Sequence, residues 1–285
     1  MQGKIHFLIV LVLIISCNKS EDVPVYETWN SLNEMEYWFP VRPVPEEKPS
    51  LGSFPWAGIT SHHILAHEYL DAYFFYLSQM REIKTFYILS PDHFSLSLQP
   101  YSLTNGSWNS GIGLVESDVN KVRSLAKALE VPLDTDVFLY EHGISALMPY
   151  IKNYFPSAKV VTIIHGRVPE VNTLISGKLT DALELEFNEA GKQENFLLIS
   201  ADFSHGENRE ITNNFDIDSR RYLEDTVNVS WNFVCCDNRA GIYILNRLGK
   251  KNLKSSILYH TNSWEISGQQ EDDITSYFFV FFGDE

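Results

Sequence analysis

The chain has 285 residues, and its 22 Lys and Arg residues against 37 Asp and Glu residues leave a formal net charge of -15. Such an excess of negative charge repels phosphate backbones, so the composition excludes a general nucleic-acid-binding protein. Hydrophobic residues make up 44% of the chain, which is typical of a globular protein, and three cysteines are too few for a disulfide scaffold.

The first 16 residues have the pattern of a signal peptide. A short start carrying Lys4 precedes an apolar stretch from Ile5 to Ile15, which is too short to span a bilayer comfortably. The Ser16-Cys17 ending resembles a bacterial lipobox, which implies cleavage before Cys17 and a lipid on its thiol. The alternative is an uncleaved anchor helix. We therefore expect a protein of the bacterial cell envelope, lipid-anchored on the extracytoplasmic side of a membrane.

Residues 17–51 are predicted to form the lipidated cysteine and a polar tether or lead-in, and residues 52–285 a single domain. Apolar strands alternate with helices in this domain. The alternation predicts an α/β fold, with a mostly parallel or mixed sheet covered by helices on both faces. The expected strands are Trp56–Thr60, Phe86–Leu89, Lys159–Ile164, Phe196–Ser200, Ser256–His260 and Ser276–Phe282. The expected helices are Leu65–Arg81, Asp118–Glu130 with Ser117 as N-cap, Gly143–Tyr154, Glu170–Asn188, Asp218–Thr226 and Gly241–Leu248.

Chemically active side chains follow three of these strands. The first strand leads into Ser61-His62-His63, the second into Ser90-Pro91-Asp92-His93, and the fourth into Ala201-Asp202-Phe203-Ser204-His205. Ligands of open α/β sheets bind beyond the carboxyl ends of the strands. We therefore expect these side chains to converge on one site.

The histidines also have structural explanations. Adjacent side chains of an extended segment point in opposite directions, so only one of His62 and His63 can enter a given pocket. Either one could instead be a hydrogen-bonded structural histidine, and His93 could be a satisfied loop residue. His165 has no partner spacing that favours a site, and His67 and His260 lie on predicted amphipathic or strand surfaces, so we interpret all three as structural.

Two acidic residues are paired with a histidine along the chain. Asp202 and His205 are three residues apart, which suits acid–base work or the orientation of a metal ligand. Asp202 could instead cap a helix. Glu141-His142 begins a predicted helix, where a carboxylate would also satisfy free backbone N–H groups. Both pairs therefore remain candidates with a capping alternative.

Cys235 and Cys236 are adjacent in the sequence. A disulfide between neighbours is strained, because adjacent Cα atoms lie closer than disulfides prefer. A buried inert thiol pair, or one thiolate acting as a metal ligand or reactive group, are the other interpretations. Two imidazoles and a thiolate would suit Fe(II), Cu or Zn better than Mg or Ca.

Taken together, these segments resemble the Memo-like family, whose prokaryotic members are named AmmeMemoRadiSam system protein B. The resemblance covers about residues 52–285. It implies an α/β domain similar to class III extradiol dioxygenases, with a non-haem metal held by His62, His93 and Cys235. It places Asp202, His205, Glu141 and His142 in the same pocket. The segments that carry it are Gly58–His63, Leu89–His93, Glu141-His142 with Pro149, Ser200–His205, and Cys235 with Gly241.

The chain departs from the family pattern at three places. Ser61 precedes the first histidine where the family has Pro, and Cys236 stands where the family has Gly after its cysteine. The family pattern Glu-His-Ser-x-Glu is Glu141-His142-Gly143-Ile144-Ser145 here, so the second carboxylate is missing. The three expected metal ligands are retained.

The first functional hypothesis is a metal-dependent redox enzyme with a dioxygenase-like site, using Fe(II), with Cu or Zn as alternatives. Neutral imidazole of His205 or His142 would move protons. The second is a metal-carrying or partner-binding accessory protein without turnover. The third is a Zn metallohydrolase with Asp202 as base. The expected partner is a small-molecule substrate or a protein of unknown identity, not a nucleic acid, and membrane contact is expected only through the Cys17 lipid.

Overall fold

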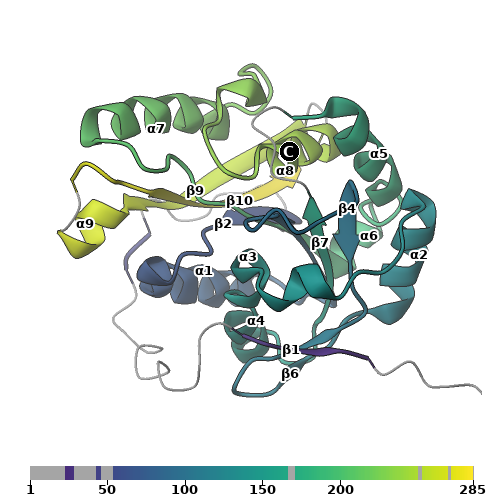
Figure 1. Cartoon of the computed structure of the whole chain (residues 1–285). Helices are drawn as coiled ribbons and strands as arrows, with labels where there is room; N and C mark the ends of the chain where they lie inside the picture. The colour runs from purple at the N-terminus through teal and green to yellow at the C-terminus, as the bar shows by residue number, and fades with distance from the viewer. Residues whose placement is uncertain are drawn as a thin grey trace, which may run out of the picture.

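Seven strands form one mixed sheet at the centre of the molecule (Figure 1). The computed structural model describes residues 23–28, 43–45, 54–165, 171–249, 252–268 and 271–284. The predicted signal peptide and Cys17 lie outside the described residues. The strand order is β4 (Tyr101–Leu103), β7 (Lys159–His165), β3 (Thr85–Pro91), β8 (Asn195–Ser200), β2 (Ala57–Thr60), β10 (Ser276–Asp284) and β9 (Leu253–Asn262).

The four central strands β7, β3, β8 and β2 are parallel, whereas β4, β10 and β9 run antiparallel to their neighbours. The parallel strands are buried along almost their whole length, as expected for strands covered on both faces. In β8, for example, Leu197 belongs to the hydrophobic core on one face, and Leu198 belongs to the core on the other. The predicted mixed sheet is thus confirmed.

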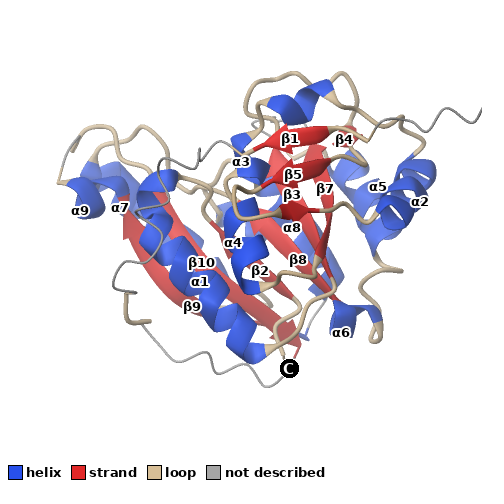
Figure 2. Ribbon diagram, turned by 90° about the horizontal axis from the view of Figure 1, so that it is seen from below, coloured by secondary structure: helices blue, strands red, loops and turns tan. Residues whose placement is uncertain are grey.

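Helices cover both faces of this sheet (Figures 1 and 2). One core contains residues of α2 (Val119–Leu129), α5 (Thr173–Leu183), α7 (Arg209–Glu224) and α8 (Arg239–Gly249). The opposite core contains residues of α1 (His67–Met80), α3 (His142–Ser145) and α4 (Met148–Tyr154). The remaining short helices are η2 (Ile64–Ala66), η3 (Asp136–Leu139), α6 (Gly191–Glu194), η4 (Trp231–Phe233) and α9 (Ser263–Ser267). Within the described residues, no helix combines the length and apolar character needed to cross a bilayer.

A second, three-stranded sheet was not predicted from the sequence. It consists of β1 (Val25–Glu27), β5 (Ser107–Asn109) and β6 (Leu114–Val115). The Tyr26 side chain is buried against Trp108, with ring centroids 5.1 Å apart, and its hydroxyl lies 2.7 Å from the Thr104 Oγ1 atom. Val25–Glu27 was expected to belong to a tether, and it instead pairs with the domain. Three residues are too few to show a strand periodicity.

Several predicted helix boundaries were wrong. The helix predicted over Gly143–Tyr154 is two helices, because Pro149 lacks the N–H that a continuous helix needs and is instead accommodated in the first turn of α4. The Asp118 side chain, and not that of Ser117, caps α2. The Asn172 side chain caps α5, which is shorter than predicted, and Asn208 caps α7, which begins nine residues before its predicted start at Asp218.

Candidate metal centre

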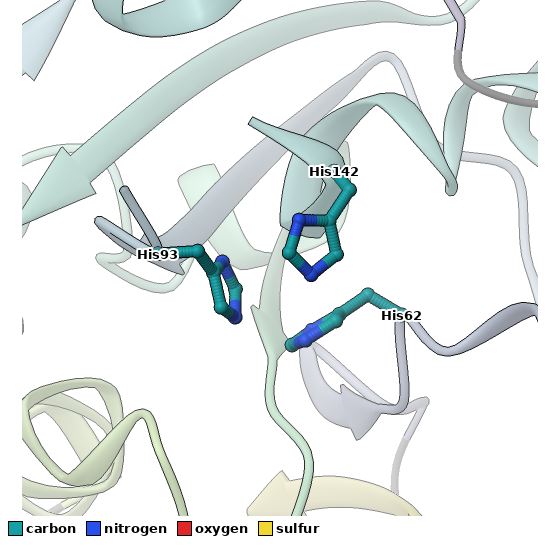
Figure 3. Close-up of side chains that lie close together, drawn as sticks. All are labelled: His62, His93 and His142. Carbon is teal, nitrogen blue, oxygen red and sulfur yellow. The ribbon is translucent and has the colours of Figure 1, made fainter. Parts of the chain in front are cut away.

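Three neighbouring parallel strands end at the same edge of the sheet, and the segments that follow them meet there. Thr60 at the end of β2 pairs with Ser200 at the end of β8, and β3 lies on the other side of β8. His62 follows β2, His93 follows β3, and His142 begins α3. One ring nitrogen from each of these three histidines lies within 4.8 Å of the others, and Figure 3 shows the rings directed toward a common point. The predicted convergence of strand ends is therefore present.

Hydrogen bonds fix the tautomer of His62. Its Nδ1 atom lies 2.9 Å from the Ser200 Oγ atom, which donates its single proton to the Gly143 carbonyl at 2.5 Å. Ser200 must therefore accept a proton from His62 Nδ1, which leaves the lone pair on Nε2. Burial lowers the pKa of His62 well below its usual value, and the neighbouring His93 and His142 lower it further. His62 thus offers a neutral Nε2 to the cluster.

Glu141 holds His93 in place. Its Oε1 lies 2.6 Å from His93 Nδ1, and its Oε2 accepts the His93 backbone N–H at 3.0 Å. The same carboxylate caps α3 by accepting the Gly143 N–H at 2.8 Å. Burial alone would lower the pKa of His93, but hydrogen bonds to Asp237 and Glu141 raise it to about 9. Burial would raise the pKa of Glu141, yet its contacts with His93 lower it. Glu141 therefore caps α3, as the capping alternative expects, and also contacts the histidine cluster.

Asp237 is a central residue of the cluster that sequence reasoning missed. Its Oδ2 atom lies 3.3 Å from His93 Nε2, 3.5 Å from His62 Nε2 and 3.9 Å from His205 Nε2. Its Oδ1 accepts the Asp202 backbone N–H at 3.1 Å, so the carboxylate is fixed. The next residue, Asn238, ties the loop to the strand ends by donating to the Leu89 and Ser200 carbonyls. The feature of the sequence that could have indicated Asp237 is its position directly after Cys235 and Cys236.

Asp202 lies beside His62 and is buried. Its Oδ1 accepts a hydrogen bond from Ser61 Oγ at 2.5 Å and one from the His62 backbone N–H at 3.4 Å. Its Oδ2 is 3.6 Å from His62 Nε2. Burial raises the pKa of Asp202 to about 8, and the nearby Asp237 carboxylate adds to this rise. Asp202 is thus a member of the site and not a helix cap.

His142 is the third imidazole of the cluster. Its ring centroid lies 4.1 Å from that of His93 and 5.2 Å from that of His62. Burial lowers the pKa of His142 to about 4, helped by the charge on His93. The following Gly143 permits this close arrangement, because a Cβ there would come within 2.3 Å of Ser90 Oγ and 2.9 Å of Glu141 Oε1. The Gly143 departure from the family pattern therefore matches the local geometry.

Two more histidines lie at the outer side of the cluster. His205 is exposed, although its Nε2 lies near Asp237. His63 is exposed too, and its Nδ1 accepts the Leu65 N–H at 3.2 Å, so it caps η2. As expected for adjacent residues of an extended segment, His62 enters the cluster and His63 does not. His165 and His260 lie elsewhere, bonded to Asn238 and Asp216 respectively.

The structure does not bring Cys235 into the histidine group. The Cys235 backbone N–H donates to Ser219 Oγ of α7, and burial and the Asp216 carboxylate raise the pKa of its thiol. Burial, followed by the charge of Asp237, raises the pKa of the Cys236 thiol strongly. Both thiols are free, so the two cysteines form no disulfide with each other. The prediction of Cys235 as a ligand gains no support from these contacts.

The donor set fits a transition-metal ion. Metal ligands about 2.1 Å from an ion lie roughly 3.0–3.5 Å from one another, and the spacings from Asp237 Oδ2 to the two Nε2 atoms fall in or near this range. The lone pair of His62 Nε2 faces the carboxylates of Asp202, at 3.6 Å, and Asp237, at 3.5 Å, so an imidazole nitrogen and carboxylate oxygens are available to a cation at the same place.

The fold and this cluster define an α/β protein with a histidine-rich centre at the carboxyl edge of its parallel strands. Residues 36–274 match the family described as Memo-like protein, so the chain belongs to this family. A MEMO1 family protein from Pyrobaculum aerophilum is 25% identical over 80% of this chain and 84% of its own length, and one from Sulfurisphaera tokodaii is 28% identical over 81% of each. A third, from Caldivirga maquilingensis, is 25% identical, and the alignment spans about half of that relative (55%).

Proposed function

We propose that the chain binds one transition-metal ion through His62, His93 and Asp237, with His142 beside it. The observation that carries the proposal is the position of Asp237 Oδ2, 3.5 Å from His62 Nε2 and 3.3 Å from His93 Nε2. Both imidazoles are held by polar groups on their far side, as ligating histidines in metalloproteins are.

The donor set favours Fe(II). Two imidazoles and one carboxylate are typical of non-haem Fe(II) oxygenases, whereas a thiolate would favour softer ions. We therefore propose a non-haem redox enzyme with a dioxygenase-like site, acting outside the cytoplasm. Cu and Zn also bind imidazole and remain alternatives that metal analysis can separate.

When bound, the metal would supply coordination positions for O₂ or a substrate. The protein residues have separate tasks. Ser200 holds His62 with its Nε2 lone pair toward the centre, and Glu141 orients the His93 ring. Because Asp202 Oδ1 already accepts two hydrogen bonds, its proton resides on Oδ2, from which it can be exchanged at the centre.

The test is metal analysis combined with oxygen consumption. We expect about one Fe per chain after anaerobic purification. We also expect substrate-dependent O₂ uptake, which the Asp237→Ala change should abolish. Fe or Cu without uptake for any substrate would favour the metal-carrying accessory protein. Zn together with hydrolysis of an ester or amide would favour a metallohydrolase.

We also propose a lipid on Cys17 that holds the protein at the outside of a bacterial membrane. The support is the apolar stretch before Ser16-Cys17. Two acyl chains suffice for stable attachment, whereas one binds reversibly. Cys17→Ser should yield an unprocessed precursor that incorporates no labelled fatty acid. Uptake of fatty acid by this variant would contradict the anchor and would leave the metal proposal untouched.

A further inference from the structure

The loop that follows His93 exposes its apolar side chains. Phe94, Leu96 and Leu98 are 49%, 43% and 93% exposed. Between them Ser97 is only partly exposed, and its Oγ bonds the Gln99 carbonyl and the Ser102 hydroxyl. In a surface loop, apolar side chains ordinarily face the core and polar ones face the solvent. This segment has the opposite arrangement, because its apolar side chains are exposed and the Ser97 side chain is turned inward. Exposed apolar groups that gather in one place mark binding surfaces.

The conformation of this loop is held from inside the protein. The buried Asp92 carboxylate accepts the Leu96 N–H at 3.1 Å and the Ser97 N–H at 2.6 Å. Ser95, between the first two apolar residues, has a φ of 55°, a left-handed conformation that a non-glycine residue adopts at a cost. These bonds fix the backbone while Phe94, Leu96 and Leu98 stay exposed. The loop is therefore preformed for a contact.

The apolar loop is continuous with the metal centre. The Phe94 ring lies 5.8 Å from the His142 ring, at an interplanar angle of 78°. The other segments that enter the centre also have exposed apolar neighbours, since Ile64 follows His63 and Tyr140 precedes Glu141. A ligand that reaches the metal cluster therefore lies next to Phe94.

We propose that the ligand of this centre is amphiphilic, with a small metal-binding head and an apolar body that lies on the loop of Phe94, Leu96 and Leu98. The inference rests on the proposed metal centre and adds the class of its substrate. The contact between Phe94 and His142 favours a ligand of the centre over a partner that covers the loop alone.

A hydroxamate series tests the proposal, because the head binds a metal ion and the tail can be lengthened. The full chain loaded with one equivalent of Co²⁺ is titrated with acetohydroxamate and octanohydroxamate, and binding is followed by the visible spectrum of the metal. Each buried methylene is worth up to about fourfold in affinity. We expect the longer tail to bind at least about tenfold more tightly. In Phe94→Ser and Leu98→Ser the ratio of the two affinities should fall toward one, because the surface that holds the tail is lost.

The matched control is Leu185→Ser, which also removes an exposed leucine (78% exposed) but lies outside the loop. It should bind both hydroxamates like the unchanged protein. Equal affinity for short and long tails would overturn the inference while leaving the metal centre intact. If acetohydroxamate does not bind, the metal has no open coordination position, and the inference is overturned as well. A further outcome is that the loop variants fail to sediment with lipid vesicles that the unchanged protein binds. If hydroxamate affinity then does not depend on tail length, the loop contacts a membrane and the inference is overturned.

Discussion

The two ends of the parallel strands carry different polar chemistry. At the amino ends of β3 and β7, four cationic residues line a cavity of about 770 Å³. Each has its own partner: Arg81 donates to the Pro55 and Gln193 carbonyls, Lys84 bonds Glu194, Lys121 bonds Asn195, and Lys159 lies near Glu116.

At the carboxyl ends the polar groups instead share one point. The Asp237 carboxylate is near three imidazoles at once, and the three clustered histidines offer ring nitrogens within 4.8 Å of one another. The cavity at the amino ends is thus lined by cationic groups that each have a separate partner. Convergence of donor atoms distinguishes the carboxyl end, which could bind a metal ion.

The largest expected effect on metal affinity belongs to the convergent end. His62→Ala and His93→Ala each remove a proposed metal ligand. Loss of an outer-shell partner typically lowers metal affinity by about 10–100-fold, and we expect a larger loss for both variants. Elemental analysis of each purified variant, with circular dichroism as a check on folding, measures this. Full occupancy in both variants would show that the metal binds elsewhere.

A second prediction separates Asp237 from Cys235. Asp237→Asn removes the anionic oxygen between His62 and His93 but keeps its size, so metal affinity should fall about 100-fold. Cys235→Ser should leave it within about twofold, because the Cys235 N–H bonds Ser219 Oγ and its thiol lies outside the histidine group. Competition with a chromogenic chelator measures both constants. The reverse order of effects would restore the thiolate ligand that the family resemblance implies.

The sequence predicted the positions that strand topology determines. His62, His93, Asp202 and Glu141 were found because each directly follows a strand or begins a helix, and both features have a recognisable periodicity. The sheet class and its main strands followed from the same patterns. Parallel strands necessarily bring their carboxyl ends to one edge.

Asp237 could not be predicted in this way. It lies in a loop whose course depends on Asn238, which reaches back to the Leu89 and Ser200 carbonyls, and such long-range bonds have no sequence periodicity. The strand at Val25–Glu27 was missed for a similar reason, since only its pairing with Ser107–Asn109 makes it a strand. Side chains brought together by loops require the structure.

A smaller effect is expected at Gly143, which supports the convergent end without a ligand atom. In Gly143→Ala the new Cβ would come within 2.3 Å of Ser90 Oγ and 3.1 Å of the His93 ring. The resulting shift should weaken the hold of Glu141 on His93 and lower metal affinity about tenfold. Isothermal titration with metal measures this. Gly177→Ala, where the nearest heavy atom is 3.7 Å from the added Cβ, is the matched control and should change nothing.

The smallest effect on metal affinity is expected at the amino end. Lys121 Nζ donates to Asn195 Oδ1 at 2.7 Å, and Asn195 is buried, so Lys121→Met leaves this acceptor without its charged donor. The free energy of unfolding should fall by about 1–3 kcal/mol, as is usual when a buried group loses a hydrogen-bond partner. Urea denaturation measures this change. Metal content should stay the same, because the lost bond involves no group of the histidine cluster. A drop in both quantities would mean that the two ends of the strands are energetically coupled, and the distinction between paired and convergent groups would then be wrong.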